Sequence, residues 1–194
     1  MQKKVGLYFG SFNPIHIGHV VIANHMVEFS DLDEVWMVVT PHNPLKKKST
    51  LLADRDRLDM VYRATKEYEN IIASDIEFNL PQPSYTVNTL AHLEEKHPRH
   101  QFALIMGEDN LNTLHKWKNS DIILERYEVF VYPRVTNSEV KEEFKNHPKI
   151  TQVKAPIMQI SSTFVRNAIR DHKRITPLLH PEVWKYIDEM NFYR

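Results

Sequence analysis

The sequence predicts an α/β fold built on an open, mainly parallel sheet with helices on both faces. Apolar runs of strand length alternate with stretches of helical spacing along the whole chain, which is the pattern of such folds. The run 34–39 is almost continuously apolar, as expected for a parallel strand buried on both faces. Polar motifs follow the predicted strands or begin the predicted helices, and parallel sheets bind ligands at that edge.

The composition indicates one ordinary domain, to which we assign residues 1–194. Lys plus Arg and Asp plus Glu both total 25, and this balance does not favour a nucleic acid or another polyanionic polymer as partner. The absence of Cys excludes disulfides and thiol chemistry. No apolar run is long enough for a signal peptide or for a membrane span of roughly 18 residues. We therefore expect a soluble cytoplasmic protein.

The first half of the chain begins with an apolar strand at 5–9, a tight turn and a helix over 18–27. After the strand at 34–39, a helix is expected at 54–68, because apolar residues recur there at helical spacing among charges. Asp54 is the expected N-cap of this helix. A third strand is expected at 71–78, so strands and helices alternate as the fold requires.

The second half continues this alternation. Ser84 or Thr86 is the expected N-cap of a helix at 87–97, and Ser161 is the natural N-cap of a later helix that continues to Arg170. The other expected elements are strands at 101–106, 127–132 and 150–153, a short helix around 122–124, and a closing helix at 181–190 with Val183, Trp184 and Ile187 on its buried side.

The most informative stretch is GSFNPIHIGH, from Gly10 to His19. It joins a strand to a helix, and Gly18 lets the backbone approach a ligand where the helix begins. The amides and the positive dipole end at a helix start favour a phosphate. His16 and His19 are three residues apart, so both imidazoles are placed to reach one phosphate group and to stabilise charge on its oxygens. Taken alone, two such histidines are equally compatible with an ordinary polar surface, and a metal pair would need a third ligand.

Further polar strings lie at predicted strand ends. The loop 41–48 carries three consecutive lysines, Lys46 to Lys48, which are either a solvated charge run or an arm that reaches a phosphate. Asp109 follows a strand directly, where a carboxylate is well placed to accept hydrogen bonds from ribose hydroxyls; a helix N-cap is the alternative. Trp117 is flanked by polar and charged residues, which weakens its interpretation as a core residue.

Ser162 and Arg166 stand at positions i and i+4 of a predicted helix and therefore share one face. A hydroxyl, the free amides of the first helical turn and a guanidinium then point towards a single anion. The alternative is a pair of capping serines beside a surface arginine. Because the carboxyl ends of parallel strands share an edge, all these strings are expected to converge there.

Together these strings carry a family resemblance. Gly10 to His19 resembles the nucleotidyltransferase signature Gly-x-Phe-Asp/Asn-Pro-x-His-x-Gly-His. With Pro83-Ser84-Tyr85-Thr86, with Gly107-Glu108-Asp109 ahead of Trp117, and with Ile160 to Arg166, the chain is similar over nearly its full length to bacterial nicotinate-nucleotide adenylyltransferases. The resemblance implies a Rossmann-like nucleotidyltransferase sheet. It also implies adenylyl transfer from ATP, accompanied by Mg²⁺, to nicotinate mononucleotide, which forms nicotinic acid adenine dinucleotide and pyrophosphate in NAD biosynthesis.

The resemblance implies a role for each matching residue. His16, His19 and Arg166 are the implied catalytic residues, in contact with the phosphates of ATP. Many members of the family have Asp at the position of Asn13, and the basic loop matches the family pattern only loosely. The implied ATP-binding residues are Gly10, Ser11, Phe12, Gly18, Gly107, Asp109, Ser161 and Ser162; those implied to bind nicotinate mononucleotide are Asn13, Lys46, Tyr85, Thr86, Trp117 and Lys118; no protein metal ligand is implied.

Three other functions stay open on the sequence. The first is the same chemistry with nicotinamide mononucleotide, phosphopantetheine or a cytidylyl acceptor. The second is a fragment of a class I aminoacyl-tRNA synthetase, which is disfavoured because no Lys-Met-Ser-Lys-Ser-like string follows. The third is a nucleotide-sensing domain without turnover, against which the intact His16 and His19 argue. The sequence also leaves open whether the chain forms a homo-oligomer.

Overall fold

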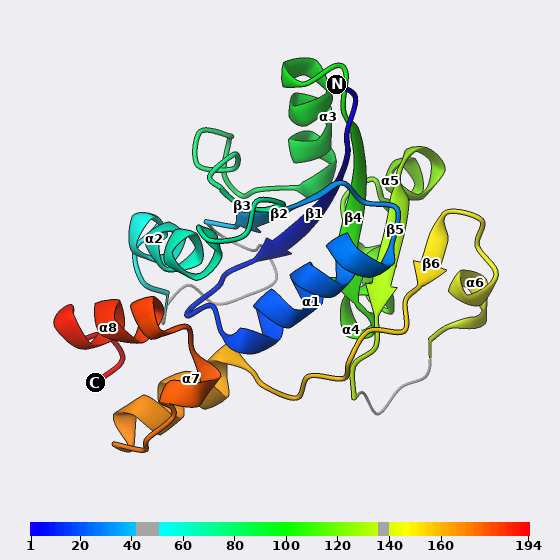
Figure 1. The fold of residues 1–194 in the computed structure, drawn as a ribbon. Helices are drawn as coiled ribbons and strands as arrows, with labels where there is room; N and C mark the ends of the chain where they lie inside the picture. Colours follow the sequence, from blue (N-terminus) through cyan, green and yellow to red (C-terminus); the bar gives the residue numbers. More distant parts are fainter. Residues whose placement is uncertain (42–50, 136–139) are drawn as a thin grey trace.

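The structure, a computed structural model, describes residues 1–41, 51–135 and 140–194. It contains an open sheet of six parallel strands in the order β3-β2-β1-β4-β5-β6, with helices on both faces (Figure 1). The predicted fold class is therefore confirmed. The strands are β1 (Lys4–Gly10), β2 (Glu34–Val39), β3 (Ile71–Ser74), β4 (Gln101–Gly107), β5 (Glu128–Tyr132) and β6 (Ile150–Gln152).

The order of the strands reverses at β1 and β4, which lie side by side at the centre of the sheet. Leu7 of β1 pairs in register with Trp36 of β2 and with Leu104 of β4. Because all strands run in one direction, Gly10 and Gly107 end β1 and β4 at the same edge. A crevice forms outside the carboxyl ends at such a reversal. The reversal therefore brings together the motifs that follow these two strands.

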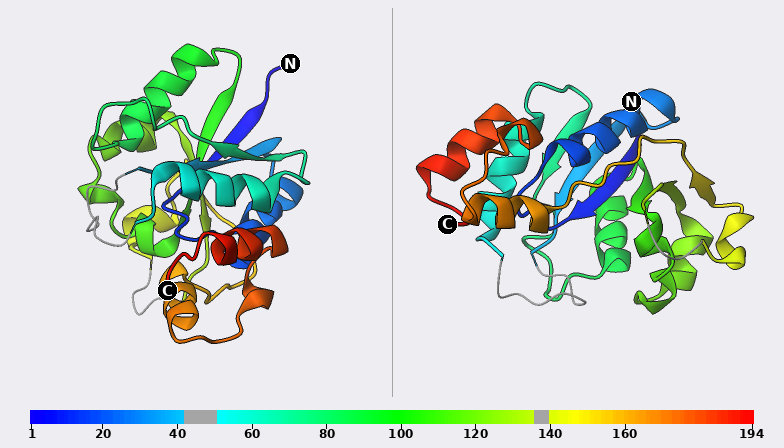
Figure 2. Two further views of the ribbon diagram at one scale, coloured as in Figure 1. Left: turned by 90° about the vertical axis from the view of Figure 1, so that its left-hand side faces the viewer. Right: turned by 90° about the horizontal axis from the view of Figure 1, so that it is seen from below.

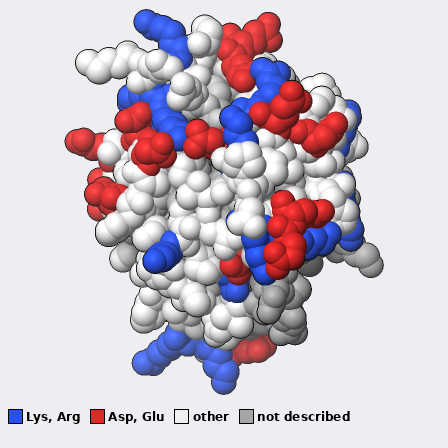
Figure 3. All heavy atoms as spheres, turned by 90° about the vertical axis from the view of Figure 1, so that its right-hand side faces the viewer, with Lys and Arg blue, Asp and Glu red and all other residues white. Residues whose placement is uncertain are grey.

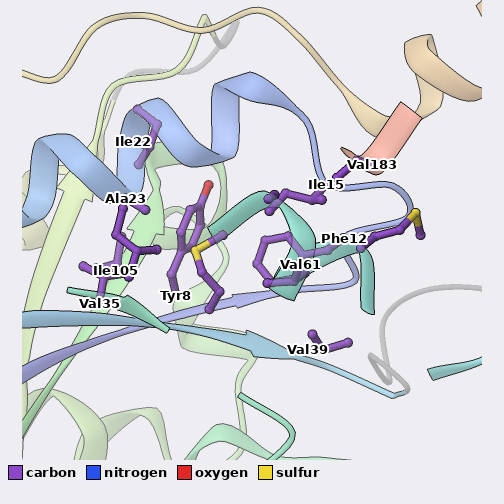
Figure 4. Packing of buried hydrophobic residues seen from close by; sticks show 14 of the residues in the cluster. Tyr8, Phe12, Ile15, Ile22, Ala23, Val35, Val39, Val61, Ile105 and Val183 are labelled. Atoms are coloured by element: carbon purple, nitrogen blue, oxygen red, sulfur yellow. The ribbon is translucent and has the colours of Figure 1, made fainter. Parts of the chain in front are cut away.

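The core consists of two apolar layers, one on each face of the sheet. Side chains alternate between faces along a strand, so Leu7 packs on one face and Tyr8 on the other. The first layer lies beneath α1 and the carboxyl-terminal helices, and Figure 4 shows Ile22, Ala23 and Ile105 within it. The second layer lies beneath α3 and α5. Each fully buried aliphatic side chain contributes about 1.5–3 kcal/mol, and both layers hold the strand ends in place.

The helices follow the predicted order, and the two views of Figure 2 show them on both sides of the sheet. In the closing helix Val183 and Ile187 are buried and Trp184 is half-buried, as its spacing predicts. Ser161 caps α7 as predicted, since its Oγ accepts a hydrogen bond from the Phe164 amide at 3.1 Å. The helices are α1 (Ile17–Phe29), α2 (Asp54–Thr65), α3 (Thr86–Lys96), α4 (Glu108–Leu111), α5 (Ser120–Arg126), α6 (Glu142–Lys145), α7 (Ser162–Arg170) and α8 (Pro181–Glu189), with short 3₁₀ turns at Leu114–Lys116 and Thr176–Leu178.

Two other predicted N-caps are wrong. Ala53 precedes α2, and Asp54 is already helical; its carboxylate accepts a hydrogen bond from Arg57 instead of capping the helix. Tyr85 occupies the N-cap position of α3, because the Ser84 hydroxyl donates to Gln82 and Thr86 is the first helical residue. The third strand is also shorter than predicted, since it ends at Ser74 and a turn follows.

Charges do not gather by sign on the face that carries β6 and α6. Figure 3 shows basic and acidic side chains interspersed there around a broad uncharged area. Within the described ranges, none of the helices has the length and apolarity that crossing a bilayer requires.

Candidate active site

A cavity of about 420 Å³ lies at the carboxyl edge of the sheet, where β1 and β4 end. Its walls come from segments that are distant in sequence: the end of β1 and the loop after it, the ends of β4 and β5, and the start of α7, with Thr40 after β2 and Leu51 before α2. Of the predicted site residues, those that line it are Gly10, Ser11, Phe12, Asn13, His16, His19, Asp109, Ser161, Ser162 and Arg166.

The two predicted catalytic histidines lie face to face at this cavity. Their ring centroids are 3.7 Å apart and the ring planes differ by 25°. His16 is the N-cap residue of α1, and its backbone amide donates to Nδ1 of His19 at 3.2 Å. Because Nδ1 of His19 is the acceptor, the proton of the neutral ring is on Nε2, which is thereby a donor. The ring of Phe12 packs edge-on against His19 with centroids 5.1 Å apart.

His16 has a lowered affinity for a proton. Burial and, secondly, the charge of Arg134 lower its pKa from 6.5 to about 4. Nδ1 of His16 is buried and has no protein hydrogen-bond partner in the described part of the chain. His16 is therefore neutral near pH 7, and the field of a bound polyphosphate would raise its pKa again.

Acid is expected to destabilise the protein through His16. Its folded pKa of about 4 lies below the ordinary 6.5, so the unfolded chain binds the proton more readily between these values. The neutral His16 ring therefore contributes its full stabilising free energy above its ordinary pKa. As pH falls towards the folded pKa this contribution is lost, and the free energy of unfolding is lower by about 2 kcal/mol at about pH 5. Urea unfolding at about pH 7.5 and pH 5 measures it. Between these two pH values His16→Asn should lose less free energy of unfolding than the wild type. Equal losses would show that the pKa of His16 is not the cause.

Gly18 lies behind the His16 ring and is not among the described residues that line the cavity. A Cβ added at Gly18 would stand 3.1 Å from Nδ1 of His16 and 3.2 Å from its Cε1. The structure thus places Gly18 where it makes room for an imidazole.

Gly18→Ala is expected to lower kcat about tenfold while the fold is retained, because the added methyl shifts the His16 ring by a few tenths of an ångström. Steady-state turnover together with thermal unfolding checks this. Unchanged kcat in the folded variant would show that the position of the His16 ring does not matter for the reaction.

Two predicted phosphate ligands are engaged with the loop after β1. Nη1 of Arg166 donates to the backbone oxygen of Asn13 at 2.7 Å, and Oγ of Ser162 donates to the oxygen of Pro14 at 2.9 Å. Nη2 of Arg166 donates to Oγ1 of Thr163 at 3.2 Å. Since a guanidinium has five donors, Arg166 keeps N–H groups for an anion in the cavity. α7 therefore both shapes and lines the site.

Asn13 is almost completely buried although it borders the cavity. Its Oδ1 accepts hydrogen bonds from the Tyr193 hydroxyl at 2.8 Å and from the Leu52 amide at 3.3 Å. The side chain that the sequence assigns to the acceptor substrate thus links the loop after β1 to the segment that follows α8.

Sequence reasoning missed Arg134, which lines the cavity just after β5. Its Nε lies 3.7 Å from Oδ1 of Asp109, and its backbone amide donates to Glu108 at 3.0 Å. Nε is buried and has no hydrogen-bond partner within the described ranges. A Cβ on Gly107 would collide with the Asp109 carboxylate, so the glycine gives this pair its room. The sequence did contain a signal for this residue, because Arg134 is a cation that follows the end of a predicted strand, β5.

Tyr8 and Tyr132, also unpredicted, form part of the cavity lining. Their hydroxyl oxygens are 3.1 Å apart, and burial raises the pKa of both groups. Both groups therefore stay neutral hydroxyls. One of them donates its proton to the other, and the second keeps its own proton for a different acceptor.

The residues that the resemblance assigns to the nicotinate ring lie apart from this lining. None of Tyr85, Thr86, Trp117 and Lys118 is among the described residues of the cavity wall. Nζ of Lys118 lies 4.5 Å from the centre of the Tyr85 ring, so these two do meet. Trp117 is half-buried against the second apolar layer. Lys46, with its neighbouring lysines, lies outside the described residues.

The described residues contain no cluster of three or more side chains suited to hold a metal ion. Mg²⁺ at phosphoryl-transfer sites keeps several waters and is bound largely through substrate phosphates.

The chain is similar in sequence to known proteins. A family model described as cytidylyltransferase-like matches residues 7–168. A protein of Flavobacterium johnsoniae described as a probable nicotinate-nucleotide adenylyltransferase is 64% identical over 191 residues, which are 98% of this chain and 99% of that protein. A protein of Christiangramia forsetii with the same description is 63% identical over 194 residues, the full length of both.

A solved structure of Plasmodium falciparum nicotinic acid mononucleotide adenylyltransferase, complexed with NaAD, superimposes with a TM-score of 0.83 at 22% identity. The match covers 98% of this chain and 97% of that one. At this identity the likeness is one of fold.

Proposed function

The chain belongs to the cytidylyltransferase-like family, and from this premise we propose that it transfers the adenylyl group of ATP to nicotinate mononucleotide. The products are nicotinic acid adenine dinucleotide and pyrophosphate. The observation that carries the proposal is that the two histidines, Asp109 and Arg166 line one cavity at the strand-order reversal. The descriptions of relatives more than 60% identical over their full length support the acceptor.

The reaction is an in-line displacement at the α-phosphorus of ATP. A phosphate monoester has a second pKa of about 6 and is mainly dianionic near neutral pH. An oxygen of the acceptor phosphate therefore attacks without a general base, a new P–O bond forms, and the bond to the β-phosphate oxygen breaks. The protein contributes positioning and stabilisation of charge, and Mg²⁺ bound to ATP shares in this.

The cavity supplies donors of two kinds. His16 and His19 present ring N–H groups beside the start of α1, where free backbone amides add to the field. Arg134 and Arg166 bring full positive charges from two other segments. Asp109 is the acidic group in this part of the lining and is suited to accept hydrogen bonds from ribose hydroxyls; its Oδ1 lies 3.7 Å from Nε of Arg134, and Oδ2 offers further acceptor sites.

The test is the acceptor specificity of the purified protein with MgATP. We expect the highest kcat/KM for nicotinate mononucleotide, measured as pyrophosphate release and as the dinucleotide product. Nicotinamide mononucleotide and phosphopantetheine are the competing acceptors, and CTP is the competing donor. Higher kcat/KM with any of these would replace the proposed substrate, and ATP binding without product would indicate a sensing domain. A cytoplasmic location stays part of this proposal.

A further inference from the structure

We propose that Arg57, a residue outside the cavity, is a positioning residue for this reaction: its buried guanidinium holds three separate pieces of the cavity wall in register. Arg57 lies in the first turns of α2 and is 0% exposed. The inference rests on the proposed function for its kinetic part and on the geometry alone for its structural part.

Every N–H of the Arg57 guanidinium has an acceptor. Nη1 donates to the backbone oxygens of Ser11 at 2.6 Å and of Thr40 at 3.0 Å. Nε donates to the oxygen of Leu52 at 3.2 Å. Nη2 donates to Pro41 at 3.5 Å and to Oδ1 of Asp54 at 2.6 Å. Five donors thus meet five acceptors, which is the condition under which a buried cation is tolerated.

The acceptors belong to the wall of the cavity or adjoin it. Ser11 and Thr40 line the cavity, as does Leu51, the neighbour of Leu52. The Leu52 amide in turn donates to Oδ1 of Asn13. The guanidinium therefore connects the loop after β1, the exit of β2 and the start of α2, which are separated along the chain but meet beside the histidines.

This arrangement does more than stabilise a helix end. The loop 11–16 is not regular secondary structure, and Phe12 within it has a positive φ of 43°. A loop in such a conformation persists only where its surroundings determine it. Arg57 donates to this loop at Ser11, and Arg166 and Ser162 donate to it at the next residues, 13 and 14. Loss of one of these contacts would let Ser11 and Asn13 move relative to His16 and His19.

Lysine cannot replace this contact. An ammonium group has three donors and no planar fork, so at least two of the five acceptors would lose their partner. A displacement of about 1 Å at a reacting centre costs up to about 10²-fold in rate. We therefore expect Arg57→Lys to lower kcat at least tenfold, and Arg57→Met to lower it by about 10²-fold, at saturating ATP and acceptor.

Two control variants separate positioning from stability. Arg55→Met removes an exposed arginine from the same helix and should leave kcat unchanged. Ile123→Val empties part of a fully buried position in α5, on the other face of the sheet, and should lower the melting temperature without lowering kcat. All rates are measured at a temperature at which each variant is folded, as judged by circular dichroism.

Hydrogen exchange gives a readout that does not depend on the substrate. Peptides covering 10–16 and 51–53 should exchange at least tenfold faster in Arg57→Lys than in the wild type, and in Ile123→Val they should not. Unchanged exchange in these peptides, or kcat within about threefold of wild type in both Arg57 variants, overturns the inference. An inactive wild type with nicotinate mononucleotide would instead refute the proposed function, and the exchange result would still decide the role of Arg57.

Discussion

Replacing His19 by Ala is expected to lower kcat by roughly 10²- to 10³-fold, the cost of removing one preorganised donor from a transition state. The structure supplies the preorganisation. The His16 amide holds Nδ1 of His19, the His16 ring stacks on one side, and Phe12 packs edge-on. The ring of His19, with its proton on Nε2, is therefore held in one orientation before substrate arrives. Steady-state kinetics with saturating ATP and nicotinate mononucleotide measures the loss.

His25 provides the matched control for this experiment. It is a histidine of the same helix, stacked on Phe29 with centroids 4.7 Å apart, and is not part of the described cavity lining. His25→Ala should keep turnover within about twofold of wild type. His19→Ala also loses an acceptor for a backbone amide at the helix start, which costs about 1 kcal/mol of stability. Wild-type turnover in His19→Ala would remove this residue from the mechanism.

Arg166→Met is expected to lower kcat by roughly 10³-fold, the upper end of the range for one donor, because the residue brings a full charge to the cavity. The variant should also lose about 1–3 kcal/mol of stability, since the buried backbone oxygen of Asn13 loses its hydrogen-bond donor. Turnover and urea unfolding measure the two effects separately.

Arg170 is the matched control for Arg166, one helical turn further along α7. Its side chain is exposed; Nη2 donates to Oδ1 of Asn167 at 3.0 Å, and Nε lies 3.9 Å from Oδ1 of Asp171. Arg170→Met should leave both kcat and the unfolding free energy near wild type. Should Arg166→Met lose stability but keep turnover, Arg166 would be a support for the loop without a part in charge stabilisation.

Much of the fold was predictable because its signals are local. The second strand has the bounds that its continuous apolar run predicts, 34–39. The Ser161 cap was likewise predictable, since the partner of its hydroxyl is the backbone amide of a residue only three positions further along the chain, Phe164. Asp54 failed as a cap because its carboxylate accepts a hydrogen bond from Arg57, three residues further on. The burial of that arginine depends on distant partners, the backbone oxygens of Ser11 and Thr40.

The site was predictable only in part, for the same physical reason. Within the stretch from Gly10 to His19 the spacing of the residues was itself enough to predict a phosphate site, and six of its residues line the cavity. Arg134 and Arg57 are single cations in ordinary surroundings of sequence, and their importance arises from contacts with segments more than ten residues away. Nothing in the spacing of the chain distinguishes Arg57, fully buried, from the exposed Arg55 two residues earlier.

The hydrogen bond from Tyr193 to Asn13 affects how this protein should be handled. Tyr193, near the carboxyl-terminal end of the described chain, contacts the loop between β1 and α1, whereas Met1 is fully exposed before the start of β1. A tag, fluorophore or surface tether attached next to Arg194 is therefore expected to disturb the contact between Tyr193 and Asn13. Attachment at the exposed Met1 leaves this contact undisturbed.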